Sequence, residues 1–345
     1  MRIVQNLDSS RNGKAYIPYS RQWLTKKDIA RVIDSLNSDW IAGDGPITKR
    51  FEAELAEKTG FKYAVAVNSG TAALHIAVEM MRFGVTHISV PALTFVATAN
   101  VVELAGLTVV LEDVHKRKLV NGDCQISVDY AGYPSGGSLI VDAAHSLRPS
   151  MNNGNNKIVC VSFHATKNSV VSGEGGALLT DDDIWHKHAL QLRAHGQGGD
   201  KNTVRLGWNY RMPDFCAALA RSQLEELEVR LARRRQIAEY YIAEFERIPE
   251  IELPAWDDNH TWHLFPIRLN SRNGFRLLLN ADGIETRVHF LPIYRHPYYA
   301  SRGIDPANFP NTEEAYKRLV SIPIFYGMKD SEVEEVVESV KRNVQ

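Results

Sequence analysis

The sequence predicts an α/β protein with a mostly parallel central sheet, helices on both faces of the sheet, and a smaller C-terminal α/β domain. From Tyr63 to Thr180, short continuous apolar runs alternate with helical patterns, which is typical of parallel strands buried on both faces. After Gly207, long helical patterns replace this alternation. A length of 345 residues fits one large and one smaller domain, because single domains are usually shorter.

The chain before this alternation is predicted to be helical. Residues 25–36 form the first helical pattern, with Thr25 as its N-cap. A glycine-containing loop then leads into an amphipathic helix over residues 47–59, which Gly60 ends.

Short strands and helices alternate in the predicted sheet region. The strands cover residues 64–67, 87–90, 108–111, 138–141, 159–163 and 177–180, and the helices between them include residues 72–81 and 97–105. Active sites of such sheets lie at the carboxyl ends of the parallel strands. Polar residues at those ends are therefore the candidates for function.

The C-terminal part is predicted to begin with one or two long helices within residues 213–245. Further strands cover residues 262–269 and 285–289, and further helices cover residues 273–281, 313–319 and 331–344. We therefore divide the chain into a large domain, residues 1–225, and a small domain, residues 226–345.

The composition argues against several classes of partner. Apolar residues make up 44% of the chain and charged residues 23%, with a formal net charge of -1, so no global field attracts nucleic acid or an anionic membrane. The most apolar stretch, residues 87–111, is interrupted by Pro91, Asn100 and Glu103, which argues against a membrane span. The sequence contains no HExxH, P-loop or dinucleotide glycine motif, and we expect no metal.

The cysteines favour a reducing compartment. Cys124, Cys160 and Cys216 are far apart and form no CxxC pair, as is usual for free thiols. No signal-peptide pattern follows Met1. We therefore expect a cytoplasmic protein.

The densest basic cluster is Arg233-Arg234-Arg235. It lies in a helical pattern that also carries several glutamates. Such mixed charge is typical of a solvated helix face, and we expect these arginines to lie on one.

Ser69-Gly70-Thr71 joins a predicted strand to a predicted helix. Free N–H groups at a helix start, two hydroxyls and a glycine that permits close approach can cradle an anion. The same residues would also serve as a plain N-cap. Taken alone, they leave both interpretations open.

Asp142 ends a predicted strand whose preceding residues are apolar. A carboxylate at a buried strand end is unfavourable unless it has a partner. The protonated nitrogen of a pyridine ring is one such partner, and an arginine elsewhere in the chain is another. His145 follows after two alanines, which leave room for a flat ring.

Lys167 lies in the loop after a predicted strand and before the turn Gly173-Glu174-Gly175-Gly176. Most lysines are solvated surface charges. This one lies among small and hydroxylated residues, 25 positions after Asp142. A lysine that burial keeps partly neutral is what Schiff-base chemistry needs.

Recognisable motifs follow one another along nearly the whole chain. They are Gly45-Pro46 with Phe51-Glu52, Val67 to Leu74, Pro91 to Thr98, Asp142 to His145, Ser162 to Asn168 with Gly173 to Gly176, Gly207 to Met212, and Ile322 to Phe325 with Gly327-Met328. In this order and spacing they resemble the DegT/DnrJ/EryC1/StrS family of sugar aminotransferases, which depend on pyridoxal 5′-phosphate (PLP). The resemblance implies the fold-type I architecture of PLP-dependent transferases, similar to aspartate aminotransferase.

The resemblance also implies a role for each matching residue. Lys167 would hold the cofactor as a Schiff base and act as general base, and Asp142 would keep the pyridine nitrogen protonated. The other implied cofactor contacts are Phe95 and His145 at the ring, Ser69, Gly70, Thr71 and Ser162 at the phosphate, and Asn209 at the phosphate of the other subunit's cofactor. His289 and Tyr298 resemble a segment near the substrate. Asn209 implies a homodimer with shared active sites.

The implied reaction moves an amino group from L-glutamate to a nucleotide-linked keto-deoxysugar, with pyridoxamine 5′-phosphate between the two half-reactions. Transamination of another small ketone or of a modified nucleotide is an alternative, and so is a non-catalytic PLP-binding regulatory protein. A third alternative is a PLP-dependent sugar dehydratase. Those enzymes resemble this chain but carry histidine where Lys167 stands, which argues against that alternative.

One stretch departs from the family's pattern. The segment between Asp113 and Asp142 is shorter than is usual in the family, and its strand is reduced to residues 125–133. We expect that a helix covering the sheet is lost here, with no effect on the site.

Overall fold

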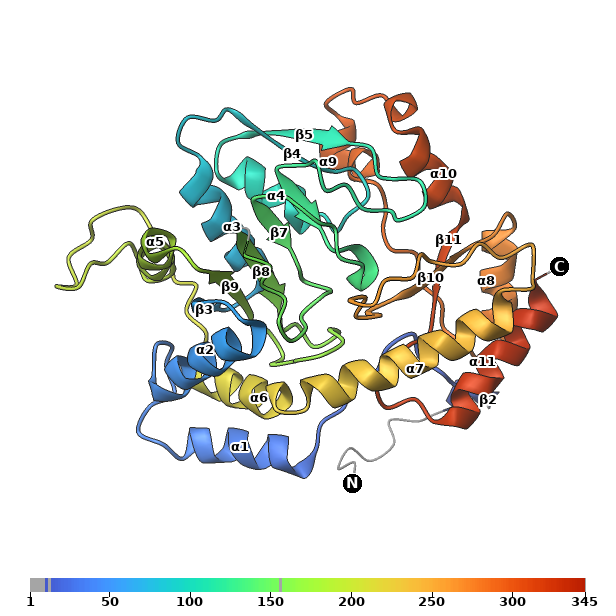
Figure 1. Ribbon diagram of the computed structural model, residues 1–345, viewed down its shortest axis with the longest axis horizontal. Helices are drawn as coiled ribbons and strands as arrows, with labels where there is room; N and C mark the ends of the chain where they lie inside the picture. Colours follow the sequence, from blue (N-terminus) through green and yellow to red (C-terminus); the bar gives the residue numbers. More distant parts are fainter. Residues whose placement is uncertain (1–9, 12–13, 155–156, 345) are drawn as a thin grey trace.

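The computed structural model describes residues 10–11, 14–154 and 157–344. Helices enclose a central sheet, and one long helix, α7 (Leu227–Phe245), leads away from it to the C-terminal elements (Figure 1). None of the helices in these ranges is both long and apolar enough to cross a membrane.

The central sheet is mostly parallel. Its hydrogen-bonded order is β3 (Tyr63–Val67), β9 (Gly176–Thr180), β8 (Ile158–Ser162), β7 (Ile140–Asp142) and β6 (Ile126–Val128), with β9 antiparallel to both of its neighbours. The parallel pair β4 (His87–Pro91) and β5 (Thr108–Glu112) continues it beside β6. Two bonds of 2.9 Å between Ser89 and Gln125 make that junction. The predicted mostly parallel sheet is confirmed.

Side chains alternate between two cores along the buried strands. In β8, Ile158 and Cys160 belong to one core, whereas Val159 and Val161 belong to the other, as the two-residue period of a strand requires. The first core is closed by α3 (Gly70–Met81), α4 (Ala97–Leu104) and α5 (Asp183–Arg193), and the second by α2 (Pro46–Thr59) and α6 (Asp214–Leu224). Helices therefore cover both faces of the sheet.

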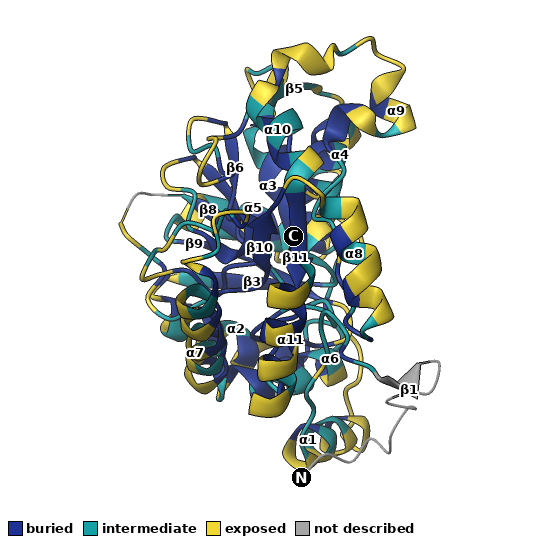
Figure 2. Cartoon of the chain, turned by 90° about the vertical axis from the view of Figure 1, so that its right-hand side faces the viewer, coloured by how far each residue is buried: buried dark blue, intermediate teal, exposed yellow. Residues whose placement is uncertain are grey.

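The C-terminal elements have a core of their own. It contains residues of α7, of α8 (Arg272–Ala281), of α11 (Asp330–Asn343) and of the antiparallel pair β10 (Phe265–Arg268) and β11 (Leu319–Ile322). In Figure 2, α8 turns buried residues inward and exposed residues outward. Ile17, from the N-terminal segment, also packs into this core. The division at residues 225 and 226 stays a prediction.

The remaining elements are short or peripheral. They are β1 (Ser10–Arg11), β2 (Lys14–Ala15), α1 (Lys26–Leu36), α9 (Pro297–Ala300), α10 (Pro310–Arg318) and the 3-10 turns η1 (Tyr130–Gly132), η2 (Ile293–Arg295) and η3 (Pro306–Asn308). Thr25 caps α1 as expected, since its side chain accepts a bond from the Asp28 N–H.

The strand expected at residues 285–289 is wrong. Only Arg287 pairs there, as an isolated bridge to Ser321 of β11. Two residues further on, the carbonyl of His289 accepts a hydrogen bond from the Tyr130 hydroxyl. The Tyr130 side chain thus satisfies a backbone carbonyl that would otherwise bond to a neighbouring strand. The pairing with β11 therefore ends after one bridge.

No α-helix lies between β5 and β7, a stretch that is described throughout. Residues 129–139 link the parallel strands β6 and β7 with only the turn η1. Buried Asp129 braces this link, because its carboxylate accepts bonds from the Ser135 N–H at 2.8 Å, the Ser135 hydroxyl at 2.7 Å and the Ser146 hydroxyl. The short link agrees with the helix loss expected from its length, and both strands remain buried.

The solvated basic face expected for residues 233–235 is wrong at Arg234. Arg233 and Arg235 keep contact with solvent and pair with Asp330 and Glu239, but Arg234 is only 2% exposed. Successive residues of a helix point about 100° apart, so three in a row cannot share one solvated face when the helix packs against the protein.

Asp214 holds the start of α2. From the first turn of α6 its buried carboxylate accepts bonds from the Ile47 N–H at 3.0 Å, the Thr48 N–H at 3.1 Å and the Thr48 hydroxyl at 2.5 Å. The N-cap of α2 is Gly45, which has no side chain to do this. A Cβ on Gly45 would collide with the Asp214 carboxylate, so the Gly45-Pro46 motif has a structural explanation.

We expect Asp214→Ala to lower the free energy of unfolding by about 2–4 kcal/mol, because it leaves several buried donors without a partner. Urea denaturation followed by circular dichroism measures this loss. The control is Glu57→Ala on the exposed side of α2, for which we expect a change within about 0.5 kcal/mol. Equal losses in the two variants would contradict the capping role.

Candidate active site

One cavity of about 380 Å³ opens at the carboxyl ends of β7 and β8. The sequence-predicted residues that line it are Ser69, Gly70, Thr71, Phe95, Asp142, His145, Ser162, Lys167 and His289. They come from segments far apart in the chain. The edge of the sheet brings them together, as expected for strands that run parallel.

The start of α3 forms one end of the cavity. The first N–H groups of a helix have no partner within it, and Gly70 and Thr71 occupy this first turn. The hydroxyl of Ser69 caps the helix by accepting a bond of 3.0 Å from the Ala72 N–H. A Cβ on Gly70 would lie 2.8 Å from the Cβ of Ser162, so glycine lets the serine of β8 approach the helix start. This end of the cavity suits an anion.

Asp142 lies at the end of β7 and is buried. Its carboxylate accepts hydrogen bonds from the Thr98 hydroxyl at 2.8 Å and from the Ala144 N–H at 3.2 Å. Burial raises the pKa of Asp142, while these two bonds and the nearby charge of Lys167 lower it. No ion pair of Asp142 with an arginine is found among the described residues. Lys167 is thus the cation that acts on this carboxylate.

Lys167 lies in the loop after β8 and lines the same cavity. Its N–H donates to the His164 carbonyl at 2.9 Å, which closes a turn. Burial lowers the pKa of Lys167 to about 8, and Asp142 opposes this shift. A substantial fraction of the amine is therefore neutral near neutral pH and can act as a nucleophile or base.

Aromatic rings border the centre of the cavity. Phe95 lies there with its ring 5.7 Å from that of Phe290. The rings of His145 and His263 lie 4.1 Å apart, and each has a buried Nδ1 without a hydrogen-bond partner. Burial lowers the pKa of both histidines well below the usual value, so both are neutral at neutral pH.

Two predicted residues lie outside this cavity. Asn209 is exposed, and its side chain accepts a bond of 3.0 Å from Arg211. Tyr298 is 59% exposed on α9, and its hydroxyl accepts a bond of 3.0 Å from Arg302. Neither side chain lines the cavity within its own chain.

The structure adds residues that sequence reasoning missed. Thr98 bonds Asp142, and Tyr19, Glu174, His263 and Phe290 line the cavity. Thr98 belongs to the motif that begins at Pro91, and its hydroxyl lies 3.1 Å from that of Thr94 in the same motif. No local pattern singles out Tyr19 or His263.

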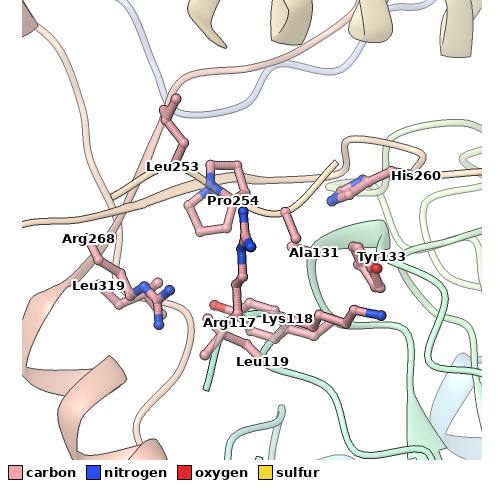
Figure 3. Close-up of a pocket in the computed structure, with 13 residues that line it drawn as sticks. Arg117, Lys118, Leu119, Ala131, Tyr133, Leu253, Pro254, His260, Arg268 and Leu319 are labelled. Carbon is pink, nitrogen blue, oxygen red and sulfur yellow. The ribbon is translucent and has the colours of Figure 1, made fainter. Parts of the chain in front are cut away.

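A second hollow lies away from this site, between the loop after β5 and the C-terminal elements (Figure 3). Arg117 and Lys118 border it, with Arg117 reaching toward Pro254 and Lys118 toward Tyr133. Its volume of about 20 Å³ leaves room for one water molecule. It is therefore too small to hold a cofactor.

The residues around the larger cavity fit PLP. The helix start with Ser162 suits the phosphate, buried Asp142 suits the ring nitrogen, and Lys167 suits the aldehyde. The unpartnered Nδ1 atoms of His145 and His263 leave polar groups for further contacts. The cavity volume is of the size usual for cofactor sites.

In the cofactor-free protein, we expect Lys167 to react with an amine reagent such as trinitrobenzenesulfonate with a midpoint near pH 8. A lowered pKa places the neutral, reactive amine at lower pH than usual. Lys341 is the comparison, since its bond to Glu244 raises its pKa, and peptide mass spectrometry follows both. In Asp142→Asn the Lys167 midpoint should fall further, because Asp142 raises that pKa. Equal midpoints for the two lysines would refute the effect of burial.

Comparison with known proteins agrees with this geometry. The sequence model of the DegT/DnrJ/EryC1/StrS aminotransferase family matches residues 22–126 and 134–341. Residues 127–133, between the two matched stretches, cover the end of β6 and the start of the short link after it.

Solved structures of this kind are similar over most of the chain. Spr1654 of Streptococcus pneumoniae, described as a sugar aminotransferase, is 25% identical in its PLP form, with a TM-score of 0.86 over 95% of this chain and 98% of that one. PseC of Helicobacter pylori, an aminotransferase of pseudoaminic acid biosynthesis, is 26% identical, with a TM-score of 0.84 over 94% and 98%. DesV of S. venezuelae is 25% identical, with a TM-score of 0.85 over 92% and 94%. The chain belongs to the DegT/DnrJ/EryC1/StrS aminotransferase family, whose members are PLP-dependent enzymes.

Proposed function

We propose that this enzyme transfers an amino group from L-glutamate to the keto group of a nucleotide-linked deoxysugar. The observation that carries the proposal is a partly neutral Lys167 in one cavity with buried Asp142 and a helix start suited to a phosphate. The sugar acceptor is supported by the similar proteins, among which Spr1654 is described as a sugar aminotransferase and PseC as part of pseudoaminic acid biosynthesis.

Each residue has a distinct task in this proposal. Bound PLP supplies an electron sink for the electrons released at the reacting carbon. Asp142 holds a proton on the ring nitrogen, and Thr98 keeps the carboxylate in place for this. The N–H groups of Gly70 and Thr71, with the Ser162 hydroxyl, hold the phosphate.

Lys167 moves the proton. A base works best when its pKa lies near the working pH, and burial brings the pKa of Lys167 to about 8. Its amine would take the proton from the substrate carbon and hold it for the return transfer, and bound PLP would supply the electron sink. Phe95, His145 and His289 border the space where this happens and exclude water from it.

We also propose a homodimer in which Asn209 reaches the phosphate site of the other subunit. The exposed position of Asn209 beside Arg211 is compatible with that reach. The orientation of α1 supports a partner as well. Buried Asp28 bonds Gln223 of α6 at 2.8 Å. Four large apolar residues of α1 and the loop after it are each about half exposed: Ile33, Leu36, Trp40 and Ile41.

The cytoplasm is the proposed location. Cys124 and Cys160 are buried and unpaired, and Cys216 is half-buried and unpaired. Free thiols are usual in reducing compartments.

Incubation with L-glutamate and a panel of nucleotide keto-sugars tests the reaction. We expect 2-oxoglutarate and one amino sugar in equal amounts, with Lys167→Ala at least about 10³-fold slower because the base is lost. Loss of oxygen from the sugar without nitrogen gain would indicate a dehydratase. No turnover of any keto-sugar would contradict the proposed acceptor.

Borohydride provides the control for the lysine. Reduction of the PLP-loaded enzyme should fix the cofactor to the peptide that contains Lys167, and Lys167→Ala should remove that label. A label on another peptide would refute the assignment.

The shared site predicts complementation between two inactive variants. When Lys167→Ala and Asn209→Ala subunits are exchanged in equal amounts, about a quarter of all sites regain both residues if Asn209 acts across the dimer. Activity should then rise from near zero towards about a quarter of wild type. If Asn209 acts within its own chain, mixing restores nothing.

The apolar face of α1 predicts the oligomeric state. Ile33→Asp with Leu36→Asp should shift the protein from dimer to monomer in sedimentation equilibrium, because charge would be buried between subunits. The control is Leu277→Asp with Leu278→Asp, which alters another exposed leucine pair, on α8, and should leave the dimer intact. Unchanged sedimentation of the α1 variant would refute this interface.

A further inference from the structure

Arg234 lies at a junction of segments behind the cavity. Its guanidinium donates to the carbonyls of Asn168 at 3.2 Å, Trp262 at 3.0 Å, His263 at 3.3 Å and Ile324 at 2.9 Å. These carbonyls belong to the loop that carries Lys167, to the segment before β10 and to the segment after β11. One side chain thus joins parts that lie far apart in the sequence.

The charge of Arg234 is balanced only by these carbonyl dipoles. Arg234 is 2% exposed, and no described carboxylate forms an ion pair with it. Burial and neighbouring Arg230 lower its pKa to about 9, so it remains a cation at neutral pH. A buried cation is unfavourable unless its donors are satisfied, and the planar guanidinium satisfies several acceptors at once.

A second set of bonds closes the junction toward the cavity. The Asn168 amide donates to the Thr261 carbonyl at 3.1 Å, and the Thr261 hydroxyl donates to the His145 carbonyl at 2.6 Å. The residue after Thr261 is Trp262, which holds a positive φ of 50°. Such a backbone is strained for a residue with a side chain and persists when its surroundings hold it.

We propose that Arg234 is a positioning residue, which ties the Lys167 loop to the segment of His263 and so sets Lys167 and the His145–His263 pair relative to each other. This inference rests on the proposed role of Lys167. Asn168 directly follows Lys167, and His263 packs on His145 at 4.1 Å, so a shift at Arg234 reaches both sides of the cavity.

The same charge acts on His263. His263 faces His145, Lys167, His289 and Arg234, and each of these cations, when charged, lowers its pKa further below the value that burial sets. Lys167 in turn faces Asp142, which raises its pKa. Removal of the Arg234 charge therefore makes protonation within the cavity easier, whereas lysine at this position would keep the charge and lose the planar fork.

The test compares Arg234→Gln and Arg234→Lys with Arg235→Gln, whose arginine lies on the solvent side of the same helix. Two readouts need no turnover: the rate at which the cofactor-free enzyme captures PLP, followed by absorbance, and the pH midpoint of the absorbance of the loaded enzyme. We expect Arg234→Gln to capture PLP about 10-fold to 100-fold more slowly, since small misplacements of a reacting group have effects of this size. Its midpoint should move upward, because loss of the Arg234 charge favours protonation of the groups next to it.

Arg234→Lys should capture PLP slowly but keep a midpoint near that of wild type, and Arg235→Gln should match wild type in both. The proposal is overturned if Arg234→Gln captures PLP at a rate within about twofold of that of Arg235→Gln and has the same pH midpoint of absorbance. If Arg234→Gln does not fold, the test uses Arg234→Lys and Asn168→Ser, because both alter the same junction. Wild-type rates of PLP capture in these two variants would also overturn the proposal. Borohydride labelling of wild type on a peptide without Lys167 would instead refute the proposed function.

Discussion

The burial of an acid and an amine in one cavity is the constraint on which this structure depends. Asp142 and Lys167 both lose water there, which raises the pKa of the carboxyl and lowers that of the amine. The Asp142 carboxylate is held by polar neighbours, the Thr98 hydroxyl at 2.8 Å and the Ala144 N–H at 3.2 Å. The neutral histidines and aromatic rings around them add no competing charge. The cavity is thus prepared for a cofactor that brings its own charges.

The fold meets this constraint by combining the central sheet with the C-terminal elements. The parallel strands β7 and β8 end at the same edge, where α3 also begins, so the sheet and its helices supply the carboxylate, the lysine loop and the helix start. The C-terminal part supplies His263, His289 and Phe290 from segments beside its own small sheet. Contacts such as that of Arg234 with Asn168 join the two parts, and the geometry of the site therefore depends on both.

Local pattern was a good guide where one element determines the outcome. The buried strands, the capped start of α3 and the cavity position of Asp142 and Lys167 agree with expectation. The sequence pattern gave wrong predictions where packing between separate segments determines the structure. We expected a strand at residues 285–289, but Arg287 alone forms a bridge there, and the Tyr130 hydroxyl donates to the His289 carbonyl. Arg234 lies in a charged run, yet the direction of one helical position buries it.

The sequence by itself determined the fold class, the family and the residues at the strand ends, because buried strands, helix starts and glycine turns leave a local record in the order of residue types. Only the tertiary structure decided which distant groups meet: Thr98 with Asp142, His263 with His145, and Arg234 with the carbonyl of Asn168. Such contacts depend on the direction of each side chain and on the packing of separate segments. The spacing of residues along the chain predicts neither the side-chain directions nor this packing.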